Sequence, residues 1–166
     1  MNIIPLTKDR LEETIIMVNG VFPDDLDAEW SPERSFRTYM KFKEDPKLFA
    51  TGWLRSLNYW IVLLGNPDEV VAVTGLYRLQ DDPNDRIWLG WYCVRADQRG
   101  KSLGRELLEW SIDVAKKDGF KKLRLYTTNS DDEARAQELY EKSGFKIVGE
   151  EINQKGYKTL YREKLL

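Results

Sequence analysis

Apolar residues recur every three to four positions in four segments of the chain, which is the spacing of an amphipathic helix. In the first segment Leu11, Ile15 and Val18 share one face, between a predicted N-cap at Thr7 and an end at Asn19-Gly20. The remaining helices are predicted from Ser31-Pro32 to Asp45-Pro46, from Ser102 to Asp118 before Gly119, and from the capping box Ser130-Asp131-Asp132-Glu133 to Gly144. A short helical piece is also expected from Asp45-Pro46 to Leu54.

Short apolar and β-branched runs separate these helices and predict strands. Gly75 inside one of them indicates a bulge or a close backbone approach. The run from Ile87 to Val94 is apolar on both faces and is expected to be one buried strand. The others are Ile3 to Leu6, Asn58 to Leu64, Val70 to Leu79, Leu123 to Thr127, Phe145 to Ile152 and Tyr157 to Leu165.

The order of these elements predicts a mixed α/β architecture. Helices come first, then an antiparallel meander, then a strand–helix–strand–helix–strand run that ends in a hairpin. No linker divides the 166 residues, so we expect a single domain over residues 1–166, with a mostly antiparallel central sheet flanked by helices.

Composition excludes several kinds of function. The chain has no histidine, which removes histidine bases, His-based triads and histidine metal sites. Its net charge of −2 argues against a dedicated nucleic-acid binder. No apolar run approaches the roughly 18–20 residues of a membrane span, and charge arrives by residue 8, so we expect a cytoplasmic protein without a membrane partner.

The segment 94–105, VRADQRGKSLGR, carries the strongest indication of a ligand. Four basic residues against one acidic residue give it a local charge of +3, at the point where a strand ends and a helix begins. A helix N-terminus offers unpaired N–H groups and a partial positive charge, which suit phosphate. Solvated basic residues at a capped helix start are the simpler explanation. A P-loop is excluded because Arg95 stands where it requires glycine, and the G-x-G spacing of a dinucleotide-binding fold is absent.

Two motifs in the second half resemble those of the GNAT superfamily of N-acetyltransferases. Arg99-Gly100-Lys101-Ser102-Leu103-Gly104 is similar to its R/Q-x-x-G-x-G/A acetyl-CoA signature, and the segment from Ala136 to Phe145 is similar to its A-x-x-L-Y-x-x-x-G-F pattern. The order of elements along nearly the whole chain also resembles that fold. Ser102 departs from the first motif glycine, and Glu133 stands where the family often has asparagine, for which the nearby Asn129 is a substitute.

The resemblance implies acetyl-CoA as cosubstrate, without a metal, and assigns roles to individual residues. The strands over 87–94 and 123–127 would splay apart, and Tyr140 would protonate the leaving thiolate, although a core aromatic explains Tyr140 as well. A main-chain N–H near Val94 would polarise the acetyl carbonyl. The implied cofactor-binding residues are Tyr92, Cys93 and Val94 through their backbone, then Arg99, Gly100, Lys101, Ser102, Leu103 and Gly104 at the diphosphate, and Asn129.

The general base is the open point of this chemistry. The stretch Trp88-Leu89-Gly90 carries no carboxylate, so the base is a carboxylate from elsewhere, a tyrosine, or ordered water. Our candidate is Glu29, in the acidic loop PDDLDAEW, which the resemblance places on the acceptor side, where it would hold a cationic amine next to Trp30. A solvated acidic loop fits the same residues equally well. Cys93 has no histidine to activate it and is expected to be a packing residue.

Together these observations predict an N-acetyltransferase that acts on a primary amine of a small cationic or amino-acid-like substrate by direct attack. Acetylation of a protein N-terminus or lysine is the alternative within enzymes. A CoA-binding sensor or interaction module without turnover is the alternative outside them, since Ser102 and the missing strand carboxylate both weaken the case for catalysis. A homodimer remains open.

Overall fold

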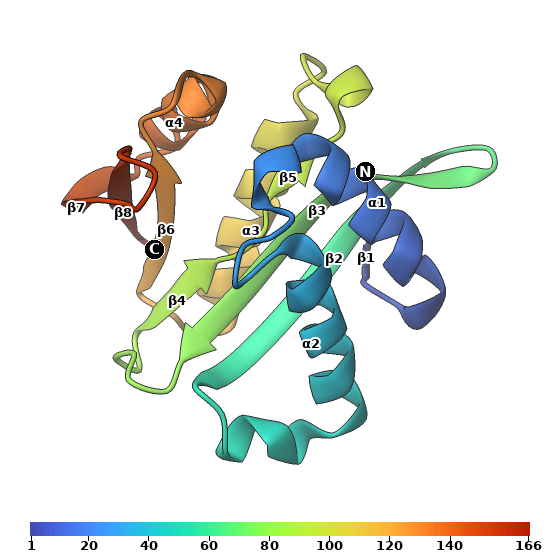
Figure 1. The fold of residues 1–166 in the computed structure, drawn as a ribbon, viewed down its shortest axis with the longest axis horizontal. Helices are drawn as coiled ribbons and strands as arrows, with labels where there is room; N and C mark the ends of the chain where they lie inside the picture. The colour runs from blue at the N-terminus through green and yellow to red at the C-terminus, as the bar shows by residue number, and fades with distance from the viewer.

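A strongly twisted, eight-stranded mixed sheet organises the protein (Figure 1). The computed structural model describes residues 1–166, with the side chain of Asp132 left aside. The strand order is β1-β2-β3-β4-β6-β8-β7, and β5 pairs with β3. The strands are β1 (Asn2–Pro5), β2 (Leu54–Gly65), β3 (Asp68–Leu79), β4 (Arg86–Leu89), β5 (Cys93–Val94), β6 (Lys122–Thr128), β7 (Lys146–Ile152) and β8 (Lys158–Leu165).

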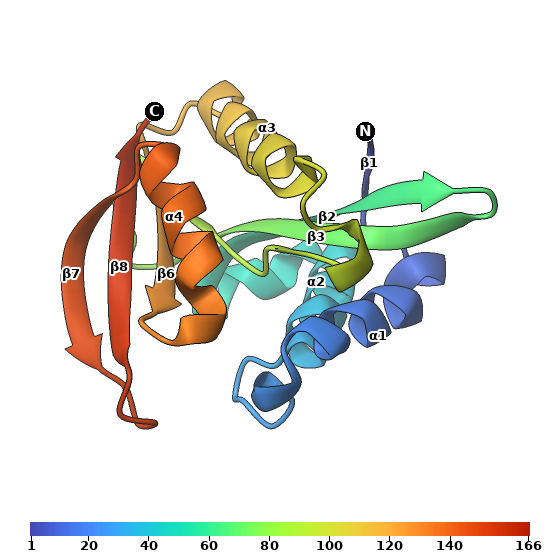
Figure 2. The ribbon, with the colours of Figure 1, turned by 90° about the horizontal axis from the view of Figure 1, so that it is seen from above.

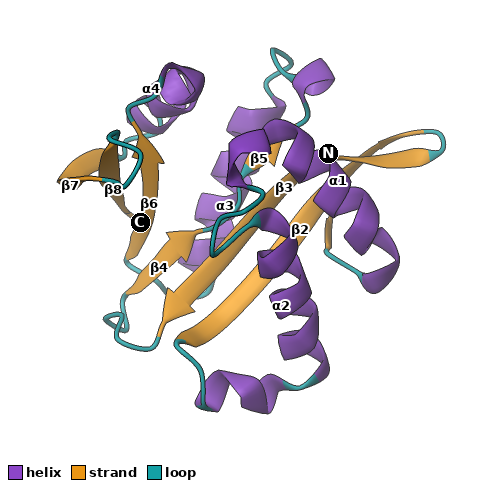
Figure 3. Cartoon of the chain, in the orientation of Figure 1, coloured by secondary structure: helices purple, strands orange, loops and turns teal.

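Helices cover both faces of this sheet (Figure 3), which confirms the predicted mixed α/β class. They are α1 (Leu11–Val21), α2 (Pro32–Glu44), α3 (Leu103–Lys117) and α4 (Ala134–Lys142). Figure 2 shows α1 and α2 on one side of β2 and β3 and α3 on the other. One buried cluster joins α1 and α2 to β2 and β3, and a second joins α3 and α4 to β3, β4 and β6. None of the helices described is long and apolar enough to cross a membrane.

The start of α2 forms as the sequence predicts. Ser31 is the N-cap, and its hydroxyl accepts a hydrogen bond from the Arg34 N–H at 3.3 Å. Pro32 occupies the first helical position, and Phe36 is fully buried. Asp45 ends the helix and caps a 3-10 turn over Pro46–Ala50. That turn is shorter than predicted, because Leu54 already pairs with Leu79 as the first residue of β2.

The predicted boundaries of α1 are wrong at both ends. Thr7 precedes a 3-10 turn over Lys8–Arg10 rather than the α-helix, and the helix continues through Gly20 to Val21. A Cβ at Gly20 would meet nothing within 4 Å, so nothing in the fold requires the chain to turn there. The helix ends where Phe22 packs on Trp91, with ring centroids 5.1 Å apart.

Gly75 marks a close approach rather than a bulge. It lies opposite Tyr59 in the β2–β3 ladder, and a Cβ built on it would fall 2.2 Å from Cε1 of the Tyr59 ring. The register shifts of that ladder lie elsewhere, between Leu54 and Ser56 and between Val62 and Leu63. The glycine therefore makes room for a buried aromatic ring.

The prediction of one continuous strand from Ile87 to Val94 is also wrong. The chain leaves the strand conformation over residues 90–92, which separates β4 from β5. The Gly90 N–H still donates to the Gly75 carbonyl at 2.8 Å, so the interruption is anchored on β3. β4 pairs in parallel with β6 over Arg86–Trp88, whereas β5 pairs with β3.

The predicted capping box before α4 does not form as proposed. Residues Asp131–Glu133 form a 3-10 turn, and α4 starts at Ala134. The Glu133 carboxylate accepts from the Thr128 N–H at 3.1 Å and from the Thr128 hydroxyl at 2.6 Å, instead of from the backbone of Ser130. Glu133 thus ties the turn back to the end of β6. Gly144, at φ +86°, follows the helix as predicted.

Candidate active site

The two central strands part where β4 gives way to β5. The parallel pairing of β4 with β6 ends at Trp88 and Arg124, and β6 then continues to Thr128 with β8 on its other edge. Within the part of the chain that the structure describes, no strand pairs with β6 beyond Arg124 on the side that faces β5. Figure 1 shows β6 and α4 diverging from β3, β5 and α3.

Val94 presents its backbone to this opening. The Arg95 N–H donates to the Val71 carbonyl at 2.8 Å, and Val94 lies opposite Ala72 in the antiparallel β3–β5 pair. Because hydrogen-bonded and non-hydrogen-bonded pairs alternate in such a ladder, the N–H and carbonyl of Val94 point away from β3. The N–H is therefore available to a ligand that enters between the strands, whereas the carbonyl accepts a hydrogen bond from Arg99 Nε.

The loop before α3 curls so that backbone amides gather at the helix start. Gly100 has φ +77° and Ser102 has φ +65°, so both lie in the left-handed region. The first hydrogen bond of the helix runs from the Glu106 N–H to the Ser102 carbonyl at 3.1 Å. The N–H groups of the residues between them precede that bond and face outward from the helix N-terminus, where they can bind an anion.

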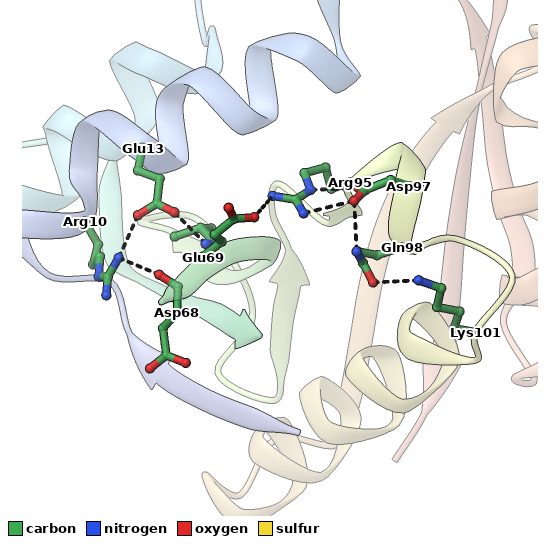
Figure 4. Close-up of polar contacts among 9 residues, drawn as sticks. Arg10, Glu13, Asp68, Glu69, Arg95, Asp97, Gln98 and Lys101 are labelled. Carbon is green, nitrogen blue, oxygen red and sulfur yellow. Dashed lines mark hydrogen bonds and ion pairs between the residues drawn. The ribbon is translucent and has the colours of Figure 1, made fainter. Parts of the chain in front are cut away.

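The positive charge of this loop is smaller than its local sequence indicates, because part of it is paired (Figure 4). Arg95 contacts Glu69 on β3 at 2.8 Å and Asp97 at 2.7 Å. The Arg95 guanidinium and the Gln98 amide lower the pKa of Asp97 to about 2. Gln98 in turn accepts a hydrogen bond from Lys101 Nζ at 3.0 Å. The count of +3 overlooked Glu69, which is distant in sequence.

Arg99 connects the loop to β5. Its Nε donates to the Val94 carbonyl at 3.0 Å. That bond fixes the side chain beside the strand end, and its terminal nitrogens make no hydrogen bond to any residue described in the structure. Arg99 therefore both holds the loop and presents donors to an anionic group.

Tyr92 and Gly104 bring the start of α3 against β5. The Tyr92 hydroxyl donates to the Gly104 carbonyl. A Cβ at Gly104 would lie 3.3 Å from the Tyr92 hydroxyl and 3.7 Å from Cγ2 of Val94. Glycine at this position lets helix and strand approach closely.

Tyr140 lies across the opening from Tyr92. Its ring is buried on α4, with ring centroids 6.1 Å from Tyr92 and 5.8 Å from Phe145. Burial, followed by the nearby Glu133 carboxylate, raises the pKa of Tyr140 well above its usual 10. The phenol is therefore protonated at neutral pH.

Cys93 faces the other way, into the core under α1 and α2. Its side chain is buried, and desolvation raises the pKa of the thiol to about 12. A protonated, buried thiol is a poor nucleophile, which agrees with the expected packing role.

Asn129 closes the β6–β8 ladder. Its N–H donates to the Lys158 carbonyl at 3.0 Å, and its side-chain oxygen accepts from the Lys158 N–H at 2.8 Å. The side chain thus already stabilises the strand end, although its amide nitrogen is not used by those two bonds.

The acidic loop lies at the tip of the β7–β8 hairpin. Lys155 Nζ contacts the Asp24 carbonyl at 3.2 Å and the Asp25 carboxylate at 3.7 Å. Glu29 is exposed, and its carbonyl accepts a hydrogen bond from Arg34 at 3.0 Å. Trp30 packs on Trp53, with ring centroids 4.3 Å apart, rather than beside the acidic side chains. The structure therefore does not bring Glu29 into contact with Tyr140 or Val94.

An aromatic cavity that the sequence analysis did not predict lies on the α1/α2 face, where β4 and β6 part. Its volume is about 420 Å³. Strand alternation could have indicated which side chains share this face, but only the sheet order brings the five strands together. The lining residues, which we call the aromatic pocket, are Tyr77, Leu79, Trp88, Tyr126, Glu151, Thr159 and Tyr161.

No group of three or more acidic or cysteine side chains within the described residues has the geometry to hold a metal ion. The site consists instead of backbone amides, arginine, lysine and tyrosine.

Comparison with known proteins identifies the class. The model of the acetyltransferase (GNAT) family matches residues 22–145, so the chain belongs to the GNAT acetyltransferase family. S-(2-succino)cysteine N-acetyltransferase from Bacillus subtilis (strain 168) is 31% identical over 80 residues, which is 48% of this chain and 47% of that protein. The match therefore spans about half of the length of that relative.

Solved structures support the same fold over the whole chain. Ribosomal-protein-alanine N-acetyltransferase from Brucella melitensis superposes with a TM-score of 0.75 at 17% identity, covering 100% of both chains. An aminoglycoside 6'-N-acetyltransferase complexed with coenzyme A superposes with a TM-score of 0.72 at 16% identity, covering 99% of this chain and 97% of that one.

Proposed function

We propose that residues 1–166 form one catalytic domain, which transfers an acetyl group from acetyl-CoA to a primary amine of a small molecule. The observation that carries this proposal is the separation of β5 from β6 directly beside the N-terminus of α3. It leaves the Val94 N–H free at a site where anion-binding amides and a buried, protonated tyrosine also meet.

The residues present fit coenzyme A. The outward amides of α3, with Arg99 and Lys101, suit a diphosphate, and the left-handed Gly100 and Ser102 produce the curl that exposes these amides. Tyr92 and Val94 line the strand edge along which an amide-containing arm would pair, and Cys93, whose backbone groups face β3, lies between them. The relative solved with coenzyme A supports this choice of cosubstrate. Leu103 and Gly104 contribute their N–H groups, and Asn129 is proposed to contact the cofactor through its amide nitrogen.

The cosubstrate supplies an acetyl group activated as a thioester. The Val94 N–H donates a hydrogen bond to the acetyl oxygen and stabilises the negative charge that develops on it during direct attack by the amine. Tyr140 then donates its phenolic proton to the departing sulfur. Its raised pKa keeps the phenol protonated before the reaction begins.

The amine must lose a proton, and Glu29 is proposed as the base. Glu29→Gln should then lower kcat/KM for the amine at pH 7 without changing the affinity for CoA. If kcat/KM is unchanged, the proton leaves through water or a tyrosine instead.

The decisive experiment measures thiol release from acetyl-CoA across a panel of small amines, with CoA binding measured separately by calorimetry. We expect Tyr140→Phe to lower kcat at least about tenfold with little change in CoA affinity, whereas Tyr157→Phe, at an exposed tyrosine, leaves both unchanged. If CoA binds and no small amine accelerates release, the protein is a CoA-binding module. Release only with peptides would instead assign a protein acceptor.

A further inference from the structure

The four rings of the aromatic pocket form a continuous row across the sheet. Tyr77 and Trp88 are 6.2 Å apart between centroids, Trp88 and Tyr161 are 6.3 Å apart, and Tyr161 and Tyr126 are 6.2 Å apart. They come from four different strands, β3, β4, β8 and β6. A row of aromatic walls attracts cations through the negative faces of the rings.

One carboxylate stands beside Tyr161, on the side of the row that faces β7. Glu151 on β7 accepts a hydrogen bond from the Tyr161 hydroxyl at 2.6 Å, and this bond raises the pKa of Tyr161 to about 12. The hydroxyl holds one oxygen of the carboxylate in place at the pocket wall. The other oxygen has no hydrogen-bond partner among the described residues and is free to accept from an ammonium group.

Positive charge near the pocket is already compensated. Arg124 lies over the Trp88 ring at 5.7 Å, and its guanidinium contacts Glu163 at 2.7 Å. Lys155 is paired with the Asp25 carboxylate at 3.7 Å. The charge of Glu151 is therefore not cancelled within the pocket.

The near end of the pocket adjoins the interruption between β4 and β5. Trp88 is the last residue of β4 that pairs with β6, so its ring lies where the strands part. A Cβ at Gly90 would be 3.4 Å from Cδ1 of Tyr77, which places Tyr77 against the interruption between β4 and β5. The pocket thus leads from that interruption toward β7.

We infer that the aromatic pocket is the acceptor site and that it selects small amines carrying a second cationic group, held between the tyrosine rings and the Glu151 carboxylate. This inference rests on the proposed acetyl transfer. Three strand spacings of about 4.8 Å separate β4 from β7, or about 14 Å along the sheet, so the two charged groups of the substrate must be several bonds apart.

Calorimetric titration with 1,8-diaminooctane, n-octylamine and 1,2-diaminoethane tests the pocket without turnover. We expect the long diamine to bind about tenfold more tightly than either of the others, because it alone satisfies both ends of the pocket. Glu151→Gln should remove this preference. Glu150→Gln is the matched control, since Glu150 is the adjacent carboxylate, faces the other side of the sheet and pairs with Lys158 at 3.1 Å.

A second variant tests the contribution of the aromatic rings separately from that of the Glu151 charge. Tyr126 is 57% exposed, so Tyr126→Leu should fold normally while losing one aromatic wall. We expect it to weaken diamine binding at least about threefold, with an unchanged Tm. In steady-state kinetics, Tyr126→Leu should likewise have a higher KM for the diamine than the unsubstituted protein, whereas the KM for acetyl-CoA should not change.

The outcomes distinguish a failure of the inference about the pocket from a failure of the proposed acetyl transfer. Equal affinity for diamine and monoamine, or an unchanged preference in Glu151→Gln, overturns the inference even if both amines are acetylated. Diamine binding that depends on Glu151, together with no thiol release by any amine, overturns the proposed transfer and leaves the cation site standing.

Discussion

The Tyr92 hydroxyl donates a hydrogen bond to the Gly104 carbonyl and so joins the residue directly before β5 to the first turn of α3. The two residues are twelve positions apart in sequence, and between them lies the whole basic loop. The bond fixes the helix N-terminus, with its outward amides, at the edge of the strand opening.

Removal of this hydroxyl should therefore loosen the site. Tyr92→Phe keeps the buried ring and loses one hydrogen bond, so we expect the free energy of unfolding to fall by about 0.5–1.5 kcal/mol. Urea denaturation measures it, with Tyr157→Phe as a control at an exposed tyrosine. An equal effect in both variants would show that the contact contributes nothing.

The contact of Gly75 with Tyr59 predicts that a substitution at Gly75 lowers the free energy of unfolding strongly, and that this loss depends on the residue at position 59. In Gly75→Ala the new methyl would overlap the Tyr59 ring, which is itself packed edge-on against Phe36 at 4.8 Å, so relief by rotation is costly. We expect the free energy of unfolding of Gly75→Ala to fall by about 2–3 kcal/mol. In a double-mutant cycle, Tyr59→Ala should make Gly75→Ala much less destabilising. Additive losses would contradict the overlap.

Ser102 occupies a left-handed conformation that costs a non-glycine residue about 1–2 kcal/mol. Ser102→Gly removes that strain but adds freedom to the unfolded chain, so we expect a net gain of about 0.5 kcal/mol. Ser102→Ala retains the strain and isolates the hydroxyl, and Ser102→Val should be the least stable. Chemical denaturation ranks the three variants. A stability of Ser102→Val equal to that of Ser102→Gly would exclude the left-handed geometry.

The pairing of Arg95 with Glu69 predicts an effect on anion binding. Glu69→Gln releases part of the Arg95 charge toward the loop, so we expect CoA to bind about twofold to fivefold more tightly at low salt, with the gain lost at high salt. Glu44→Gln makes the same change in net charge at an exposed carboxylate paired with Lys8. An equal gain in that control would assign the effect to overall charge.

The burial of the Cys93 thiol predicts slow alkylation of this residue in the folded protein. Because burial raises the pKa of Cys93 to about 12, iodoacetamide at pH 8 should label the native protein at least about a hundredfold more slowly than the unfolded chain. The folded pKa lies above the unfolded one. The stabilisation linked to this thiol is therefore complete below pH 9 and is lost as the pH rises from 9 toward 12. Rapid native labelling at pH 8 would contradict the burial.

Local signals in the sequence predicted much of this molecule, because they act within a few residues. The cap at Ser31 and the end of α4 at Gly144 are each fixed by the local backbone demands of one residue. The same holds for the loop before α3, whose glycines and basic residues indicated an anion site without knowledge of the fold.

Other features depended on partners far away in sequence. The interruption of the strand at residues 90–92 follows from pairing with β3 on one side and β6 on the other, and Glu69 reaches Arg95 only through the same sheet. Glu29 was chosen for its place in the acidic loop, and the structure leaves its side chain exposed. The aromatic pocket was missed because its seven residues come from five strands.

The sequence by itself determined the class of fold, the family motifs and the absence of histidine, since these are properties of residue order and identity. Only the tertiary structure decided where the strands part, which charges are free and which aromatic side chains share a wall. Those depend on strand order and register, and contacts between distant strands form through packing of the whole sheet rather than through any local preference.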